Sequence, residues 1–172
     1  MATAIDEIQH YDASPDEVFE MLSDPSYIEK KCLASGSTEA SAQVIDDPGG
    51  KISIVARRVL PAELPSFAKK FVGETIVLTE TQNWRPASAD GSRAAGFVVD
   101  FDKNPISFNG AVELKPSGAG TTVETKGAIK CSVVFVGGKI ERVAQDWIVR
   151  YLTKEQEVGN EWLAGDSDPE GA

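Results

Sequence analysis

The sequence predicts an α+β domain in which a curved antiparallel sheet of about seven strands wraps around one long C-terminal helix. Three observations indicate this class. The length of 172 residues suits a single domain. Segments in the middle of the chain alternate between apolar and polar residues, as strands do. Near the C-terminus the apolar residues instead recur with the 3.6-residue period of a helix.

The first elements are expected to be a strand over residues 4–11 and two short helices. The stretch Ser14-Pro15-Asp16-Glu17 is a capping box with proline at the first helical position, and a helix begins there. In this motif the Ser14 hydroxyl accepts the Glu17 amide, and the Glu17 carboxylate returns to the Ser14 amide. Proline at position 25 starts a second helix, which runs to Leu33 and ends before Gly36.

Six strands should follow, because β-branched and apolar residues alternate with polar ones between turn sequences rich in Gly, Pro, Asp and Asn. Most of the connections are short, which favours an antiparallel meander. The link over residues 61–73 is the exception, since it is too long for a hairpin. The predicted strands are residues 38–46, 51–60, 74–84, 93–101, 106–114 and 121–134.

A single amphipathic helix is expected over residues 140–163. From Glu155 onward the chain has six acidic residues and no basic ones, so residues 166–172 are expected to form an acidic, flexible tail after a domain of residues 1–165. The apolar stripe of the helix is Ile140, Val143, Ala144, Trp147, Ile148, Tyr151 and Leu152.

Four stretches of the sequence are similar to a known family. They are Arg57–Pro61, Phe67–Phe71 with Gly73, Thr81–Pro86 and Val136–Glu141. On these residues the chain resembles the actinobacterial family DUF2505, whose function is unknown, within the START-like or helix-grip (SRPBCC) superfamily. That superfamily includes lipid carriers, plant ligand binders and aromatic polyketide cyclases. The resemblance spans residues 5–163; it implies the helix-grip fold, often with an apolar cavity between sheet and helix, and supplies no catalytic residue.

Composition argues against several classes of function. A net charge of −10 opposes binding to nucleic acid or to anionic lipid surfaces. No apolar run is long enough to cross a bilayer, and the N-terminus resembles no secretory signal, so a cytoplasmic protein is expected. Cys32 and Cys131 lie far apart in sequence without clustered histidines, so we expect two buried thiols, no metal site and no cofactor.

The chain also has few candidates for catalysis. His10 is the only histidine, and it stands at the end of the first strand. No serine lies in a GxSxG motif, and the glycines at 118 and 120 do not make a dinucleotide loop. The sequence therefore favours a protein without catalytic activity.

Polar residues of two strands are candidates for a ligand site. Glu80 and Gln82 share a strand face with Leu78, whereas threonines occupy the opposite face. If the first face points inward, Glu80 becomes a polar group in an apolar cavity; the alternative places the threonines inside and Glu80 in solvent. Arg58 could likewise point inward, to pair with Glu80 or a ligand carboxylate, or form a cross-strand ion pair at the surface.

Aromatic residues of the sheet and last helix either fill the core or line a cavity. The preferred function is non-catalytic binding or carriage of a small hydrophobic molecule or lipid. Alternatives are a cyclase-like or hydrolase-like enzyme that uses Glu80 or Arg58 in the same cavity, and a protein-interaction module or homodimer. The predicted ligand-binding residues are Arg58, Leu78, Glu80, Gln82, Phe97, Phe108, Trp147 and Tyr151.

Overall fold

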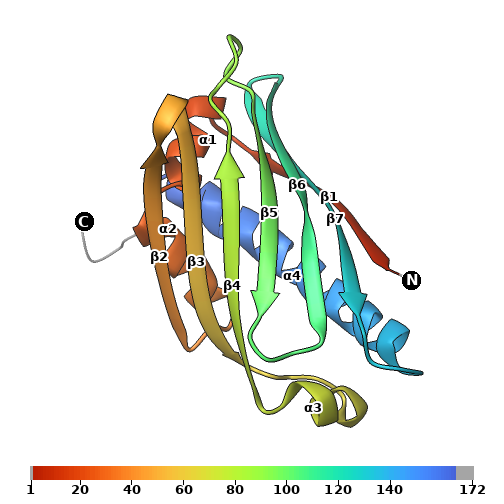
Figure 1. Ribbon diagram of the computed structural model, residues 1–172. Coiled ribbons are helices and arrows are strands. Elements are labelled where there is room, and N and C mark those ends of the chain that lie inside the picture. Colours follow the sequence, from red (N-terminus) through yellow and green to blue (C-terminus); the bar gives the residue numbers. More distant parts are fainter. Residues whose placement is uncertain (1, 166–172) are drawn as a thin grey trace.

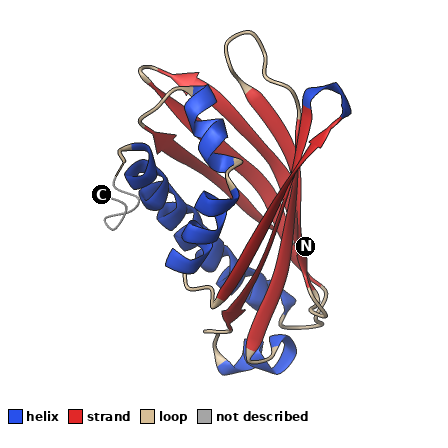
Figure 2. Ribbon diagram, turned by 90° about the vertical axis from the view of Figure 1, so that its left-hand side faces the viewer, coloured by secondary structure: helices blue, strands red, loops and turns tan. Residues whose placement is uncertain are grey.

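A seven-stranded antiparallel sheet forms one side of the molecule, and three of its helices cover the concave face (Figures 1 and 2). The structure, a computed structural model, describes residues 2–165. In spatial order the strands are β1 (Thr3–Tyr11), β7 (Gly120–Cys131), β6 (Ile106–Ser117), β5 (Arg93–Phe101), β4 (Thr75–Trp84), β3 (Lys51–Pro61) and β2 (Glu39–Asp47).

The helices are α1 (Pro15–Leu22), α2 (Pro25–Ala34), α3 (Ser66–Val72) and α4 (Gly137–Leu163). A 3₁₀ turn, η1 (Pro48–Gly50), joins β2 to β3. The predicted α+β helix-grip fold is confirmed. The tail predicted for residues 166–172 lies outside the described residues.

The concave face is covered unevenly. Helix α4 packs on β1 and β7 at one edge of the sheet and also contacts α1 and α2. Helix α2 packs on β2 at the opposite edge. The inner faces of the central strands β4 and β5 therefore lie opposite a space that the helices border rather than fill.

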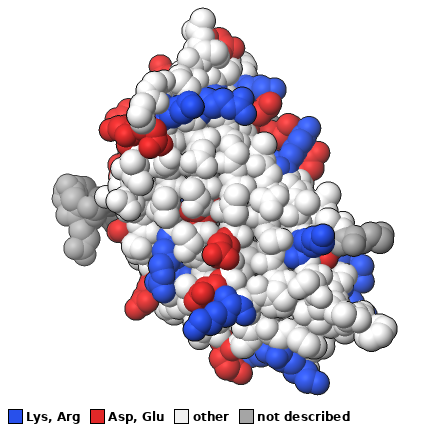
Figure 3. Space-filling view, in the orientation of Figure 1, with Lys and Arg blue, Asp and Glu red and all other residues white. Residues whose placement is uncertain are grey.

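The outer face of the sheet carries uncharged residues over much of its centre, with charges of both signs interspersed around them (Figure 3). Strand β4 explains this pattern, because Ile76, Leu78 and Trp84 are buried on its inner face. The side chains of a strand alternate between faces, so the threonines of β4 lie outside.

Three local predictions were wrong or incomplete. The link over residues 61–73 contains α3, a seven-residue helix without a side-chain cap, too short to give a clear helical period. The last strand ends at Cys131 rather than Val134, since the Cys131 amide donates to the carboxylate of Glu141 (2.9 Å) as the chain turns into α4. At Ser14 the hydroxyl accepts the Glu17 amide (3.3 Å), but the Glu17 carboxylate lies 3.2 Å from that hydroxyl instead of bonding the Ser14 amide.

No helix within residues 2–165 is both long enough and apolar enough to cross a membrane.

A glycine in α4 allows close approach of two tyrosine rings. A Cβ atom on Gly159 would lie 2.5 Å from Tyr11 Cε1 and 3.0 Å from the Tyr27 hydroxyl oxygen. Gly159→Ala should therefore lower the free energy of unfolding by about 1–3 kcal/mol through overpacking, although alanine favours helices.

The matched control is Gly138→Ala in the first turn of the same helix, where the nearest atom to a new Cβ is 4.0 Å away. This substitution should be neutral or stabilise the protein by up to about 1 kcal/mol. Urea unfolding of both variants measures the difference, and equal effects of the two substitutions would contradict the packing described here.

Candidate functional site

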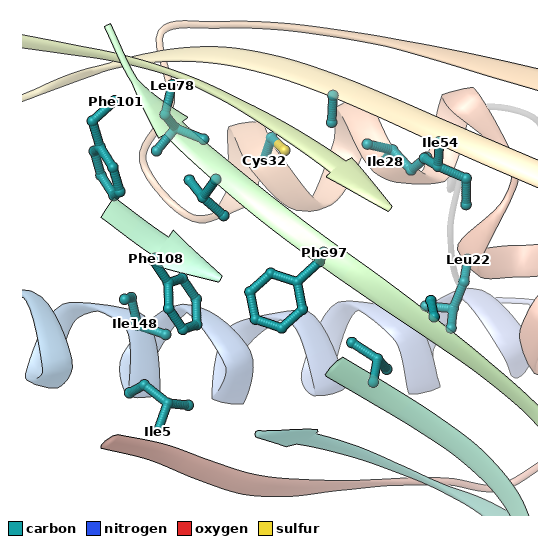
Figure 4. Packing of buried hydrophobic residues seen from close by; sticks show 14 of the residues in the cluster. Ile5, Leu22, Ile28, Cys32, Ile54, Leu78, Phe97, Phe101, Phe108 and Ile148 are labelled. Atoms are coloured by element: carbon teal, nitrogen blue, oxygen red, sulfur yellow. The ribbon is translucent and has the colours of Figure 1, made fainter. Parts of the chain in front are cut away.

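A cavity of about 330 Å³ lies between the sheet and helices α2 and α4. Its wall includes inner-face residues of β3 to β7 and one side of α4. Figure 4 shows the rings of Phe97 and Phe108 pointing from the sheet into the space above α4. All eight side chains predicted for ligand binding line this cavity: Arg58, Leu78, Glu80, Gln82, Phe97, Phe108, Trp147 and Tyr151.

The orientation of β4 decides between the two arrangements that the sequence left open. Glu80 and Gln82 line the cavity, and the threonine face is outside. The buried Trp84 on the same face fixes this choice, and its indole Nε1 donates to Gln82 Oε1 (2.8 Å). The strand thus places a carboxylate and an amide among apolar neighbours because the large apolar residues at both ends of the strand must be buried.

One part of the cavity is apolar and contains several aromatic rings. Phe97 of β5 and Phe108 of β6 make an edge-to-face contact, with ring centroids 4.9 Å apart. Such pairs hold aromatic rings in a fixed geometry. Other apolar residues that line the wall include Leu60, Val99, Phe101, Val112, Val123, Trp147 and Ile148.

The other part of the cavity contains a buried ion pair that sequence reasoning missed. Lys31 of α2 bonds to the carboxylate of Glu155 on α4, and both side chains are less than a tenth exposed. Gln9 of β1 donates from Nε2 to Glu155 Oε1 (2.7 Å) and to the backbone oxygen of Leu152 (2.9 Å). These bonds satisfy the carboxylate and join three elements at one point.

A stacked arginine lies beside this pair. The guanidinium carbon of Arg58 is 4.0 Å from the ring centroid of Tyr151, a cation–π geometry. Its Nη1 lies 3.9 Å from the Cys32 sulfur, and its buried Nε has no hydrogen-bond partner among the described residues. Because Arg58 faces the cavity, the surface ion pair considered from the sequence is wrong.

Burial and charge together shift the protonation equilibria of this cluster. Burial is the largest single influence on Lys31 and lowers its pKa, but the Glu155 carboxylate, Tyr151, Tyr27 and Glu80 together raise it by more, so the lysine pKa lies well above its ordinary value. Burial also raises the pKa values of Tyr11, Tyr27 and Tyr151, because the charged tyrosinate is poorly solvated there. The site at neutral pH therefore holds a charged lysine and three neutral phenols.

Of the buried residues that the sequence did not predict, Glu155 had a recognisable pattern around it, whereas Lys31 and Gln9 did not. Glu155 follows Tyr151 and Leu152 by four and three positions, and Val158 and Gly159 continue the same buried stripe. An acid at a stripe position is a signal for a buried charge, but the run of acidic residues from Glu155 onward made Glu155 resemble the start of the acidic tail. The sequence around Lys31 and Gln9 gave no such signal, because each belongs to a short element whose burial depends on distant partners.

His10 is exposed and does not line the cavity.

The curved sheet, the long helix and the cavity between them define a START-like, helix-grip protein. Within that class, this chain belongs to DUF2505, a family of proteins of unknown function whose model matches residues 6–163. A relative described as an uncharacterized protein of Mycobacterium tuberculosis is 23% identical over 173 residues, which cover 95% of this chain and 98% of the relative.

Solved structures of similar fold support the class. An aromatase/cyclase from a Streptomyces species matches with a TM-score of 0.63 at 13% identity, over 95% of this chain and 96% of that one. A START superfamily protein from Mycobacterium smegmatis gives 0.61 at 13% identity, over 93% and 98%. A STAR-related lipid transfer protein from Xanthomonas axonopodis gives 0.61 at 13% identity, over 94% and 85%.

Removing one charge of the buried pair should be costly. Glu155→Gln leaves the Lys31 ammonium buried without its counter-charge, so the free energy of unfolding should fall by about 3–5 kcal/mol. The combined change of Lys31→Met with Glu155→Leu removes both charges and should recover most of that loss. Denaturant unfolding of the single and double variants measures both effects.

The control is Glu157→Gln on the same helix, since the Glu157 carboxylate pairs with Lys154 at the surface (3.2 Å). That exposed pair should contribute less than about 1 kcal/mol. A double variant as unstable as Glu155→Gln alone would contradict the assignment of the loss to an uncompensated charge.

The raised pKa values predict alkaline unfolding. The chain has three tyrosines, and all three belong to this cluster. The unfolded chain releases their protons near pH 10, whereas the folded protein retains them. The pKa of Lys31 is likewise raised in the folded protein. Stability from these groups is thus fully present below about pH 10 and is lost as pH rises above it.

Near-ultraviolet absorbance should therefore detect no tyrosinate in the native protein near pH 10, and tyrosinate should appear together with loss of near-ultraviolet circular dichroism. A reversible titration of tyrosine near pH 10 in protein that remains folded would contradict this.

Proposed function

We propose that the protein binds and carries a small, mainly apolar molecule in the cavity and does not transform it. The observation that supports this most is the division of the cavity into an aromatic part around Phe97 and Phe108 and a charged part around Arg58 and Lys31. A mainly apolar pocket with a few convergent polar groups is typical of ligand sites.

The size and position of the cavity limit the ligand. A volume of about 330 Å³ is at the lower end of the usual range of roughly 300–1,000 Å³ for such sites, which favours one small molecule over a large lipid. Four exposed residues also border the cavity, so it reaches the surface between α2, α4 and the link after β3. These are Ala34, Glu63, Arg150 and Lys154.

The names of similar structures agree with this proposal only in part. One of them is a lipid transfer protein and another an aromatase/cyclase, so both carriage and catalysis occur on this fold. The enzymatic alternative keeps one specific observation in its favour, because both of its candidate groups, Glu80 and Arg58, line the cavity. Cyclase-like or hydrolase-like turnover of a bound molecule would favour that alternative.

A homodimer stays a prediction, for which sedimentation at several concentrations is the test.

Binding of an uncharged fluorophore tests the proposed cavity. N-phenylnaphthylamine should bind one molecule per protein and gain fluorescence, because its rings suit the aromatic wall. Trp147→Ala should weaken this binding about ten-fold through loss of wall contacts. Because Trp147 is half-buried beside an existing cavity, the substitution should cost less than the roughly 3–5 kcal/mol of a tryptophan in solid core.

The matched control is Trp162→Ala. Trp162 is also a half-buried tryptophan of α4, but it packs on Tyr27 and does not line the cavity. The fluorophore should bind this variant as it binds the original protein. Absence of binding, or equal loss in both variants, would overturn the proposed function.

A further inference from the structure

We propose that the ligand carries a single acidic group, a carboxylate in the simplest case, and that Arg58 binds this group. The inference rests on the proposed function, since it names the chemical class of the molecule in the same cavity. Three observations support it: Arg58 has hydrogen-bond donors without acceptors, Lys31 is already paired with Glu155, and the charges of the cavity wall nearly cancel.

Arg58 is partly buried and has unused hydrogen-bond donors. A guanidinium group has five N–H donors in its plane, and contact of its carbon with the face of Tyr151 uses none of them. Within residues 2–165 the side chain makes one hydrogen bond, to the Cys32 sulfur at 3.9 Å, a long contact to a weak acceptor. Among the described residues no carboxylate lies within 4.0 Å of Arg58, and its Nε is buried without a partner.

A charge that has lost part of its solvation and has no counter-charge is unfavourable, so a partner is expected where Arg58 faces the cavity. The geometry suits a carboxylate, because the planar fork of the guanidinium can bind both oxygens at once. The ring of Tyr151 holds the arginine from one side and leaves the edge of the group for this contact.

The neighbouring lysine is already satisfied. Lys31 is bonded to Glu155, whose other oxygen accepts from Gln9, so this pair is neutral and complete. Unlike Lys31, Arg58 lacks a carboxylate partner within the described part of the chain.

Glu80 does not neutralise Arg58 directly. The register of β3 and β4 places Arg58 opposite Leu78 and Ala56 opposite Glu80, so the two charged residues are diagonal neighbours on one face. They do not approach within ion-pair distance. Glu80 should instead repel a second negative charge on the ligand, which restricts the ligand to a single one.

The charge of the cavity wall agrees with a singly charged anion. Four basic residues and three acidic residues line it, in a chain whose net charge is −10. A molecule with one negative charge therefore balances the wall. The basic residues are Lys31, Arg58, Arg150 and Lys154, and the acidic ones are Glu63, Glu80 and Glu155.

Paired ligands that differ in one group test the inference. Decanoic acid and decanol share the same alkyl chain, and at neutral pH the acid carries the negative charge. Each is titrated against protein loaded with N-phenylnaphthylamine, and the ratio of their dissociation constants is the readout. The acid should bind about 10- to 100-fold more tightly than the alcohol, the range expected for a charge-assisted hydrogen-bond pair.

Two substitutions should change that ratio in opposite directions, and a third is the control. Arg58→Gln should remove most of the preference for the acid. Glu80→Gln should increase the preference, because it removes the repulsive carboxylate. Arg57→Gln, which changes net charge as Arg58→Gln does but lies exposed on the outer face, should leave the ratio unchanged. Near-ultraviolet circular dichroism of each variant verifies that it is folded.

The outcomes separate this inference from the proposed function. Equal affinities for the acid and the alcohol, or equal effects of the substitutions at 57 and 58, would overturn the acidic ligand and leave an apolar carrier. If the fluorophore does not bind, both proposals fail; if it binds and neither compound displaces it, the acidic ligand alone is overturned. If Arg58→Gln does not fold, the acid-to-alcohol ratio in the unmodified protein and in Glu80→Gln decides.

Discussion

One geometric constraint governs this structure: a single helix cannot cover the concave face of a seven-stranded sheet. Helix α4 packs along β1 and β7, and α2 packs on β2, so the central strands are opposite a gap. Protein interiors are normally filled, because an unfilled void forfeits dispersion contacts along its wall. The inward rings of β5 and β6 nevertheless leave about 330 Å³ open, and that open volume is the basis of the proposed function.

The ion pair of Lys31 and Glu155 has both a structural and a chemical consequence. Together with Gln9 it joins α2, α4 and β1, the elements that border the cavity. An apolar pair of similar volume would join these elements at least as well. Two charges lose their solvation when they are buried, and their mutual attraction rarely exceeds that loss by much. What the charged pair adds is a polar end to an otherwise apolar cavity, with Arg58 and the three tyrosines around it.

Much of this arrangement follows from local sequence patterns. Proline and serine at the helix starts, glycine-rich turns and the stripe of α4 predicted the order of elements. Alternation along β4 then placed Glu80 on the same face as Leu78. The phase of each strand is set by which face is buried, so Trp84 rather than any local preference decided that Glu80 points inward.

The parts that could not be predicted depend on long-range contacts. The partners Lys31 and Glu155 are 124 positions apart, and the period of either helix alone does not reveal that they meet. Gln9 is buried and Ile8 is half-exposed because β1 turns its odd-numbered residues toward α4. Helix α3 is a short element at one end of the sheet, whose formation the local pattern does not indicate (Figure 2).

A crystal structure of the protein with decanoic acid would test most directly whether the cavity holds an acidic, apolar ligand. We expect one molecule in the cavity, with its carboxylate within hydrogen-bond distance of the Arg58 guanidinium and its alkyl chain between Phe97, Phe108 and α4. A cavity without the acid at saturating concentration, or a molecule bound with its carboxylate among the phenylalanines, would show that the proposed ligand site is wrong.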